Sequence, residues 1–175
     1  MQQIMVKQPT RDDAHWDAVE EAAELLVERR HGEALVLLRD AIKADPNNPY
    51  AYHHLGAAFY DMKNLEGARD AYRAALRLAP DYLGSRVGLS HVLRELGDPE
   101  AALAEAKEAL RRFPKDGDAL HASGLAYAAL GKRTKACEKL EAYLGTNPEL
   151  EATHEVRQIL EMLGIGPDDE PIEFD

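Results

Sequence analysis

Apolar residues recur along most of the chain at every third or fourth position, which is the spacing of one face of an α-helix. The first such stretch predicts one helix that begins near Asp12 or Asp13 and carries apolar residues as far as Val27. Either aspartate can accept hydrogen bonds from free backbone N–H groups at the helix start. A second helix is predicted over about 33–43, and similar stretches follow up to residue 163. Alanine and leucine dominate, so the pattern predicts an all-α fold and gives no sign of a sheet.

The helical pattern repeats with a period of 34 residues. Four prolines mark that interval, namely Pro46, Pro80, Pro114 and Pro148. The clearest repeat lies between Pro46 and Pro80. The residues that define its spacing are Tyr52, Leu55, Gly56, Phe59, Ala68, Tyr72 and Ala75. We expect the two helices of this repeat to cross closely at Gly56 and Ala68, since a larger side chain would push the backbones apart. The aromatic side chains are expected to fill the space between adjacent hairpins.

In these residues and their spacing, the sequence resembles the tetratricopeptide repeat (TPR) family over about residues 13–163. The resemblance implies an all-α, right-handed superhelical solenoid of about four helix hairpins plus a C-terminal capping helix. The first repeat is degenerate, because Glu21 and Ala22 stand where the family has leucine and glycine. The expected segments are a flexible leader (1–11), four repeats (12–46, 47–80, 81–114 and 115–148), a capping helix (149–164) and an acidic disordered tail (165–175).

The composition narrows the classes of partner. The net charge of −11 argues against nucleic-acid binding, which needs clustered lysine and arginine side chains. Five of the acidic residues lie within the last eight, so the rest of the chain is only mildly acidic, as in ordinary bacterial-type helical proteins. No run of about 18 apolar residues is present, so we expect no membrane insertion. The single cysteine, Cys137, excludes an intramolecular disulfide and fits a reducing, cytoplasmic location.

The resemblance also implies where a ligand binds, because TPR proteins usually hold an extended or helical peptide against their first helices. The corresponding groove residues are Trp16, Tyr50, His53, Ala57, Tyr60, Val87, His91, Arg94, His121 and Leu125. Family members that bind the acidic C-termini of chaperones use a clamp of Lys, Asn and Arg, and neither Lys nor Asn stands in these positions here. We therefore expect stacking and apolar contacts to dominate, with Arg94 holding one carboxylate.

Three of these groove residues are histidines, His53, His91 and His121. Three interpretations of these histidines are open: a metal site, a pH-sensitive groove, or polar side chains on a hydrated surface. No pair of them shares a helix at i, i+4, and no cysteine or carboxylate stands beside them in the way metal sites need. We therefore expect no metal and no cofactor.

Catalytic constellations are also missing from the pattern. Ser90 and His91 are adjacent in the sequence, so on a helix they point about 100° apart and cannot pair as nucleophile and base. The glycines form no phosphate-binding loop after a strand. Cys137 is best explained as a small, half-buried side chain of a second helix. We expect no enzymatic activity and assign no catalytic residue.

The resemblance therefore favours a non-catalytic protein–protein interaction module, an adaptor that binds a peptide or helix in its concave groove. Two other classes stay open, a cytoplasmic chaperone for secreted proteins and a self-assembling scaffold. A homo-oligomer could form through the first hairpin, where Trp16 is uncovered. It could also form through the C-terminal segment 171–175, which alternates apolar and acidic residues and could itself dock into a groove.

Overall fold

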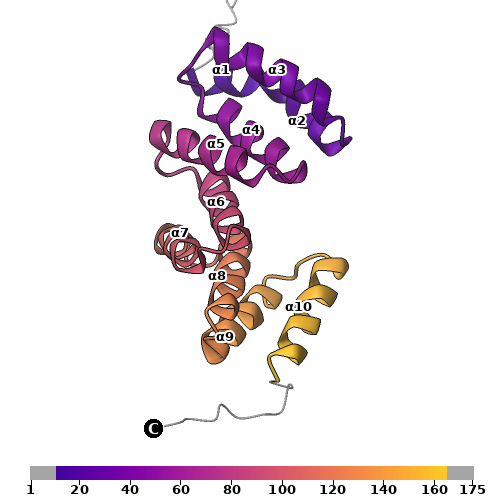
Figure 1. The fold of residues 1–175 in the computed structure, drawn as a ribbon, viewed down its shortest axis with the longest axis vertical. Helices are drawn as coiled ribbons and strands as arrows, with labels where there is room; N and C mark the ends of the chain where they lie inside the picture. Colours follow the sequence, from indigo (N-terminus) through magenta and orange to yellow (C-terminus); the bar gives the residue numbers. More distant parts are fainter. Residues whose placement is uncertain (1–10, 165–175) are drawn as a thin grey trace, which may run out of the picture. The chain divides into compact units, whose positions relative to one another are not determined.

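The computed structural model describes residues 11–164, and within them the chain forms ten α-helices and no strand (Figure 1). The predicted all-α helical repeat fold is therefore confirmed over this range. The acidic tail and nearly all of the predicted leader lie outside the described residues. None of the described helices is long and apolar enough to cross a membrane.

The chain divides into two compact units, residues 1–85 and 86–175, and each is described by itself. The first unit contains α1 (Arg11–Asp17), α2 (Glu20–Val27), α3 (His31–Ala44), α4 (Pro49–Asp61) and α5 (Leu65–Leu78). The helix α6 (Leu83–Glu95) begins in the first unit and continues into the second. The second unit contains α7 (Pro99–Arg112), α8 (Gly117–Ala129), α9 (Arg133–Leu144) and α10 (Leu150–Met162).

In the first unit, α2 packs against α3 and α4 packs against α5. The core of the α2–α4 region is formed by Val19, Ala22, Leu38, Ala41 and Ala51. At the crossing of α4 and α5, a Cβ atom added to Gly56 would lie 2.8 Å from the Tyr72 ring. Ala68 on α5 is fully buried. The close crossing explains why the chain places small residues at both positions.

The prediction of one helix from Asp12 or Asp13 to Val27 is wrong, because the helix is interrupted at Ala18 and Val19. Val19 has φ −125° and ψ −4°, and its N–H donates to the Trp16 carbonyl at 2.9 Å, one residue short of α-helical spacing. Val19 nevertheless stays in the core, with 1% of its surface exposed. Apolar spacing could not reveal the break, because residues 16 and 19 also have the i, i+3 spacing of one face of a continuous helix.

In the second unit, α8 packs against α7 and α9, and α10 packs against α9. Gly124 on α8 repeats the role of Gly56, because an added Cβ atom would lie 2.7 Å from the Leu140 side chain. Tyr143, a bulky residue in a position where the repeat pattern has alanine, is buried in a core with Leu120, Leu140 and Val156. Val156 comes from α10, so the last helix covers apolar surface of the hairpin before it.

Candidate functional site

Aromatic and imidazole rings gather around the start of α4 in the first unit. We call Trp16, Tyr50, His53, His54 and Tyr82 the aromatic cluster. Successive ring centroids lie 5.6 Å apart for Trp16 and Tyr50, 5.3 Å for Tyr50 and Tyr82, and 4.7 Å for Tyr82 and His53. His54 lies 5.0 Å from His53 and 5.9 Å from Trp16 by the same measure. The structure therefore brings together three predicted groove residues, Trp16, Tyr50 and His53.

The start of α4 is fixed by Asn48, which is 1% exposed. Its side-chain oxygen accepts hydrogen bonds from the backbone N–H groups of Tyr50 at 3.0 Å and Ala51 at 3.3 Å. Pro49 occupies the first turn, where its missing N–H costs little. This cap sets the direction in which α4 presents Tyr50 and His53.

The short helix α1 holds Trp16 in the cluster through contacts that sequence reasoning missed. The His15 side chain is buried, and its Nε2 atom lies 2.8 Å from a carboxylate oxygen of Asp45. The Asn48 amide donates to the His15 carbonyl at 2.8 Å, and the Tyr50 hydroxyl donates to Asp12 at 2.8 Å. Trp16 remains 42% exposed, so a large part of its ring is available to a ligand.

The aromatic cluster is uncharged at neutral pH. Burial, and secondarily the neighbouring His54, lowers the pKa of His53 to about 4. Burial also lowers the pKa of His54 and raises the pKa of Tyr82. His53 uses its Nδ1 atom in a 3.1 Å hydrogen bond with the Ser85 hydroxyl. The cluster can therefore offer ring faces and edges without the cost of desolvating a charge.

A second group of predicted residues meets in the second unit, and we call His91, Arg94 and His121 the histidine–arginine site. The imidazole centroids of His91 and His121 lie 5.7 Å apart. The His121 ring stacks on Tyr143, with centroids 4.9 Å apart and planes at 29°. Arg94 follows His91 by three residues on α6, so both side chains leave the same face of that helix.

The two imidazoles of this site are also held neutral. Burial lowers the pKa of His91 to about 4, and the neighbouring His121 and Arg94 act in the same direction. Burial likewise lowers the pKa of His121, while Asp118 acts in the opposite direction. The Nε atom of Arg94 is buried and has no hydrogen-bond partner in the described part of the chain.

The remaining predicted groove residues contribute unequal amounts of surface. Ala57 and Tyr60 on α4 and Leu125 on α8 are half-buried. Val87 is only 8% exposed, so it offers little surface to a ligand. Ser85, Leu89 and Ser90 on the same helix are buried as well.

A cavity of about 580 Å³ opens on the first unit between α1, the α3–α4 loop and the end of α5. Its lining residues are Arg11, Asp12, His15, Asn47, Pro49, Leu78 and Ala79. Its lining comes from segments far apart in the sequence, so apolar spacing could not place it.

Ser90 and Cys137, two residues considered for catalysis, are both buried. The Ser90 hydroxyl donates to the Ala102 carbonyl at 2.8 Å and is buried, which joins α6 to α7. Cys137 is 4% exposed, and burial raises the pKa of its thiol, which disfavours the reactive thiolate. Among residues 11–164, no group of three or more His, Cys, Asp or Glu side chains is arranged to hold a metal ion.

Two protein-family models match the chain, and both are described as tetratricopeptide repeat. One matches residues 25–87 and the other matches residues 87–151. Anaphase-promoting complex subunit 7 of Arabidopsis thaliana is 33% identical over 142 residues, which cover 78% of this chain and 25% of that protein. Protein FlbA of Caulobacter vibrioides is 30% identical over 82 residues, which cover 47% of this chain and 14% of that protein. The chain thus spans a quarter or less of the length of these relatives.

Solved structures share the fold. TTC0263, a TPR protein of Thermus thermophilus, is 28% identical with a TM-score of 0.70, and the match covers 85% of this chain and 80% of that one. PilW, a type IV pilus biogenesis factor, is 21% identical with a TM-score of 0.75, over 91% and 73% of the two chains. YrrB, described as a TPR protein with an unusual peptide-binding site, is 20% identical with a TM-score of 0.67, over 85% and 75%.

Proposed function

The chain belongs to the tetratricopeptide repeat family, and we propose that it is a non-catalytic adaptor that binds a peptide or helix of a partner protein. We place binding residues in each unit separately, in the aromatic cluster of the first unit and in the histidine–arginine site of the second.

The observation that carries the proposal is the aromatic cluster. Five rings on one unit form edge-to-face or tilted pairs in which neighbouring centroids lie within 6 Å, and Trp16 keeps 42% of its surface exposed. Aromatic side chains are enriched in protein interfaces, where they bury large areas and lose little conformational freedom. A cluster held by a helix cap and by the docked helix α1 is also preorganised, which reduces the entropy lost on binding.

The test is affinity capture from the native lysate, followed by titration of the captured partner's peptides. Trp16 is the only tryptophan of the chain, so its fluorescence reports directly on the aromatic cluster. The groove variant is His53→Ala/Tyr60→Ala/His91→Ala/Arg94→Glu. We expect the wild type to capture a protein whose peptide shifts the Trp16 emission, and we expect the groove variant to lose it.

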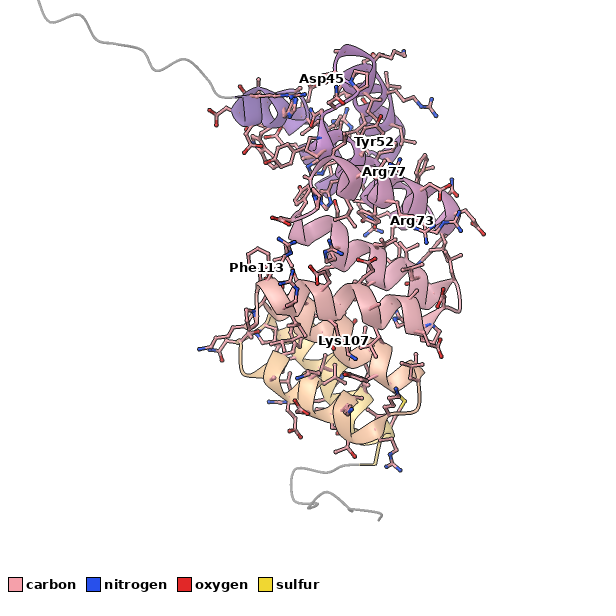
Figure 2. The ribbon with its side chains drawn as sticks, turned by 90° about the vertical axis from the view of Figure 1, so that its left-hand side faces the viewer. Asp45, Tyr52, Arg73, Arg77, Lys107 and Phe113 are labelled. Atoms are coloured by element: carbon pink, nitrogen blue, oxygen red, sulfur yellow. The ribbon has the colours of Figure 1, made fainter. Side chains whose placement is uncertain are left out.

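A matched control replaces exposed residues outside both groups, Arg39→Ala/Arg73→Ala/Lys115→Ala. Figure 2 shows Arg73 on α5. The control should capture the same partner as the wild type. Retention by the groove variant, with loss in the control, would move the binding surface elsewhere and refute the proposal.

A further inference from the structure

Arg94 carries a buried donor without an acceptor. Its Nε atom is excluded from solvent and has no hydrogen-bond partner within the described residues. The Arg94 guanidinium forms an ion pair with Glu95, whose carboxylate oxygen lies 3.7 Å from Nη2, longer than a hydrogen bond. Buried donors in native proteins nearly always have a partner, so this Nε atom calls for an acceptor that the described residues do not supply, which a water molecule or a ligand oxygen can provide. The same holds for His54 Nε2, His31 Nδ1 and Ser123 Oγ, but of these four atoms only Arg94 Nε belongs to a charged side chain.

The two imidazoles beside Arg94 extend this site. His91 and His121 lie 5.7 Å apart between ring centroids, and the stacking of His121 on Tyr143 fixes its plane. Burial favours the neutral form of both rings in the free protein. The charged side chains that act on the pair are Arg94 and Glu95 of α6, Asp118 of α8 and Glu155 of α10.

These charges are distributed unevenly over the pair. Asp118 and Glu155 act on His121 and Glu95 acts on His91, whereas Arg94 acts on both imidazoles. One carboxylate therefore acts on His91 and two act on His121, so a bound anion would have the larger effect on His91. An anion bound between Arg94 and His91 would act on the guanidinium and on both rings.

We propose, building on the proposed function, that Arg94 and His91, assisted by His121, bind a carboxylate of the protein ligand and that this binding takes up a proton. A carboxylate has two acceptor oxygens in one plane, which match the planar N–H groups of a guanidinium. The bound anion also stabilises the imidazolium form of His91, which then becomes a second charged donor. The aromatic cluster, by contrast, supplies only uncharged contacts.

The size of the pH dependence follows from linkage. A carboxylate that returns the pKa of His91 from about 4 to the ordinary value of about 6.5 binds about tenfold more tightly at pH 5.5 than at pH 7.5. The sign is fixed, because the pKa is lower in the free protein than in the complex. Aspartate side chains, with an ordinary pKa of about 3.9, stay ionised over this range.

The experiment uses the full chain and capped dipeptides, followed by NMR of the imidazole and guanidinium N–H and C–H signals. Acetyl-Leu-Asp-amide is compared with acetyl-Leu-Asn-amide, and acetyl-Leu-Gly free acid is compared with its amide. We expect the acids to shift the His91, His121 and Arg94 signals, with about tenfold tighter binding at pH 5.5. The first pair detects a side-chain carboxylate and the second pair a C-terminal one. Equal shifts from acids and amides, or no shift from any acid at 50 mM, would overturn the proposal.

Variants separate this site from the surface as a whole. Arg94→Gln should abolish the preference for acids. Arg94→Lys should keep part of this preference, because lysine retains the charge but lacks the paired N–H groups of the guanidinium. His91→Asn should keep the preference for acids but lose most of its pH dependence. Arg73→Gln, which removes an exposed arginine from α5, should leave both unchanged.

If lysate capture succeeds while acids show no preference, the adaptor function stands and only the carboxylate site is refuted. A specific acid preference without capture refutes the adaptor function alone.

Discussion

The aromatic cluster of the first unit and the histidine–arginine site of the second unit use the same side chain in different surroundings. His53 and His91 both have a pKa lowered to about 4, chiefly by burial. His53 has a hydroxyl partner in Ser85 and aromatic neighbours, so its polar atoms are largely satisfied within the unit. His91 instead lies beside a second imidazole and an arginine whose Nε atom has no partner in the described residues.

Burial alone does not determine what a histidine can do. Desolvation makes both rings neutral. Only a ring that lies beside a cation with an unpaired N–H donor can respond to a bound anion. The same unusual pKa therefore has a packing role in one unit and, on our proposal, a ligand-sensing role in the other.

The largest effect is expected from filling the close helix crossings. In Gly56→Leu, the new side chain must displace the Tyr72 ring, which lies 2.8 Å from the position of an added Cβ. In Gly124→Leu it must displace Leu140, at 2.7 Å. Overpacking of this kind should lower the free energy of unfolding by about 3 kcal/mol in each case, as measured by urea denaturation.

Gly32→Leu is the control for size, since nothing lies within 4 Å of an added Cβ there. It should change the free energy of unfolding by less than about 1 kcal/mol. Hydrogen exchange should place the loss from Gly56→Leu in α4 and α5, and the loss from Gly124→Leu in α8 and α9. Unchanged exchange in those helices would contradict the assigned crossings.

The next effect is the loss of stability in acid. The unfolded chain protonates histidine near pH 6.5, whereas the folded chain holds the pKa of His53 and His91 at about 4. The unfolded state therefore binds more protons between these values, and stability falls as the pH is lowered from about 6.5 to 4. Each imidazole should account for about 2 kcal/mol between pH 7.5 and 4.5.

Urea denaturation of His53→Asn and His91→Asn at several pH values measures these contributions separately. Each variant should lose about 2 kcal/mol of the pH dependence. His154→Asn, at an exposed position on α10, should keep the wild-type profile. A carboxylate ligand should reduce the acid loss in the wild type and in His53→Asn but not in His91→Asn, because Arg94 lies near His91 and not in the aromatic cluster.

The features that recur with the repeat could be predicted from the sequence, and the features built by single long-range contacts could not. The prolines at 34-residue spacing and the small residues of the repeat identified the helical repeat, and the close crossings at Gly56 and Gly124 require the small residues. The interruption at Val19 was missed, and so were the contacts of His15 with Asp45 and Asn48, which lie 30 and 33 residues further along the chain and attach α1.

The candidate site shows the same division. Positions in the repeat placed His91, Arg94 and His121 among the groove residues, and the structure brings the two imidazoles together. The burial of Val87 and the partnerless Nε of Arg94 depend on how neighbouring helices fill the space around α6, which a repeat pattern does not specify. Tyr82 joined the aromatic cluster from the turn before α6, outside the positions that the pattern marks.

The smallest effect concerns the attachment of α1, which only the first unit has. Asn48→Ala removes the cap of α4 and the hydrogen bond to the His15 carbonyl, both within a residue that is 1% exposed. We expect a loss of about 1–2 kcal/mol in the free energy of unfolding, with a shift of Trp16 emission toward that of exposed indole. Asn47→Ala, at an exposed neighbouring position, should change neither quantity. Since α1 presents Trp16 to the cluster, a partner that binds there should also bind Asn48→Ala more weakly, while the acid preference of the histidine–arginine site stays unchanged. Equal weakening of both would show that the two sites are not independent, and would end the division of roles drawn here.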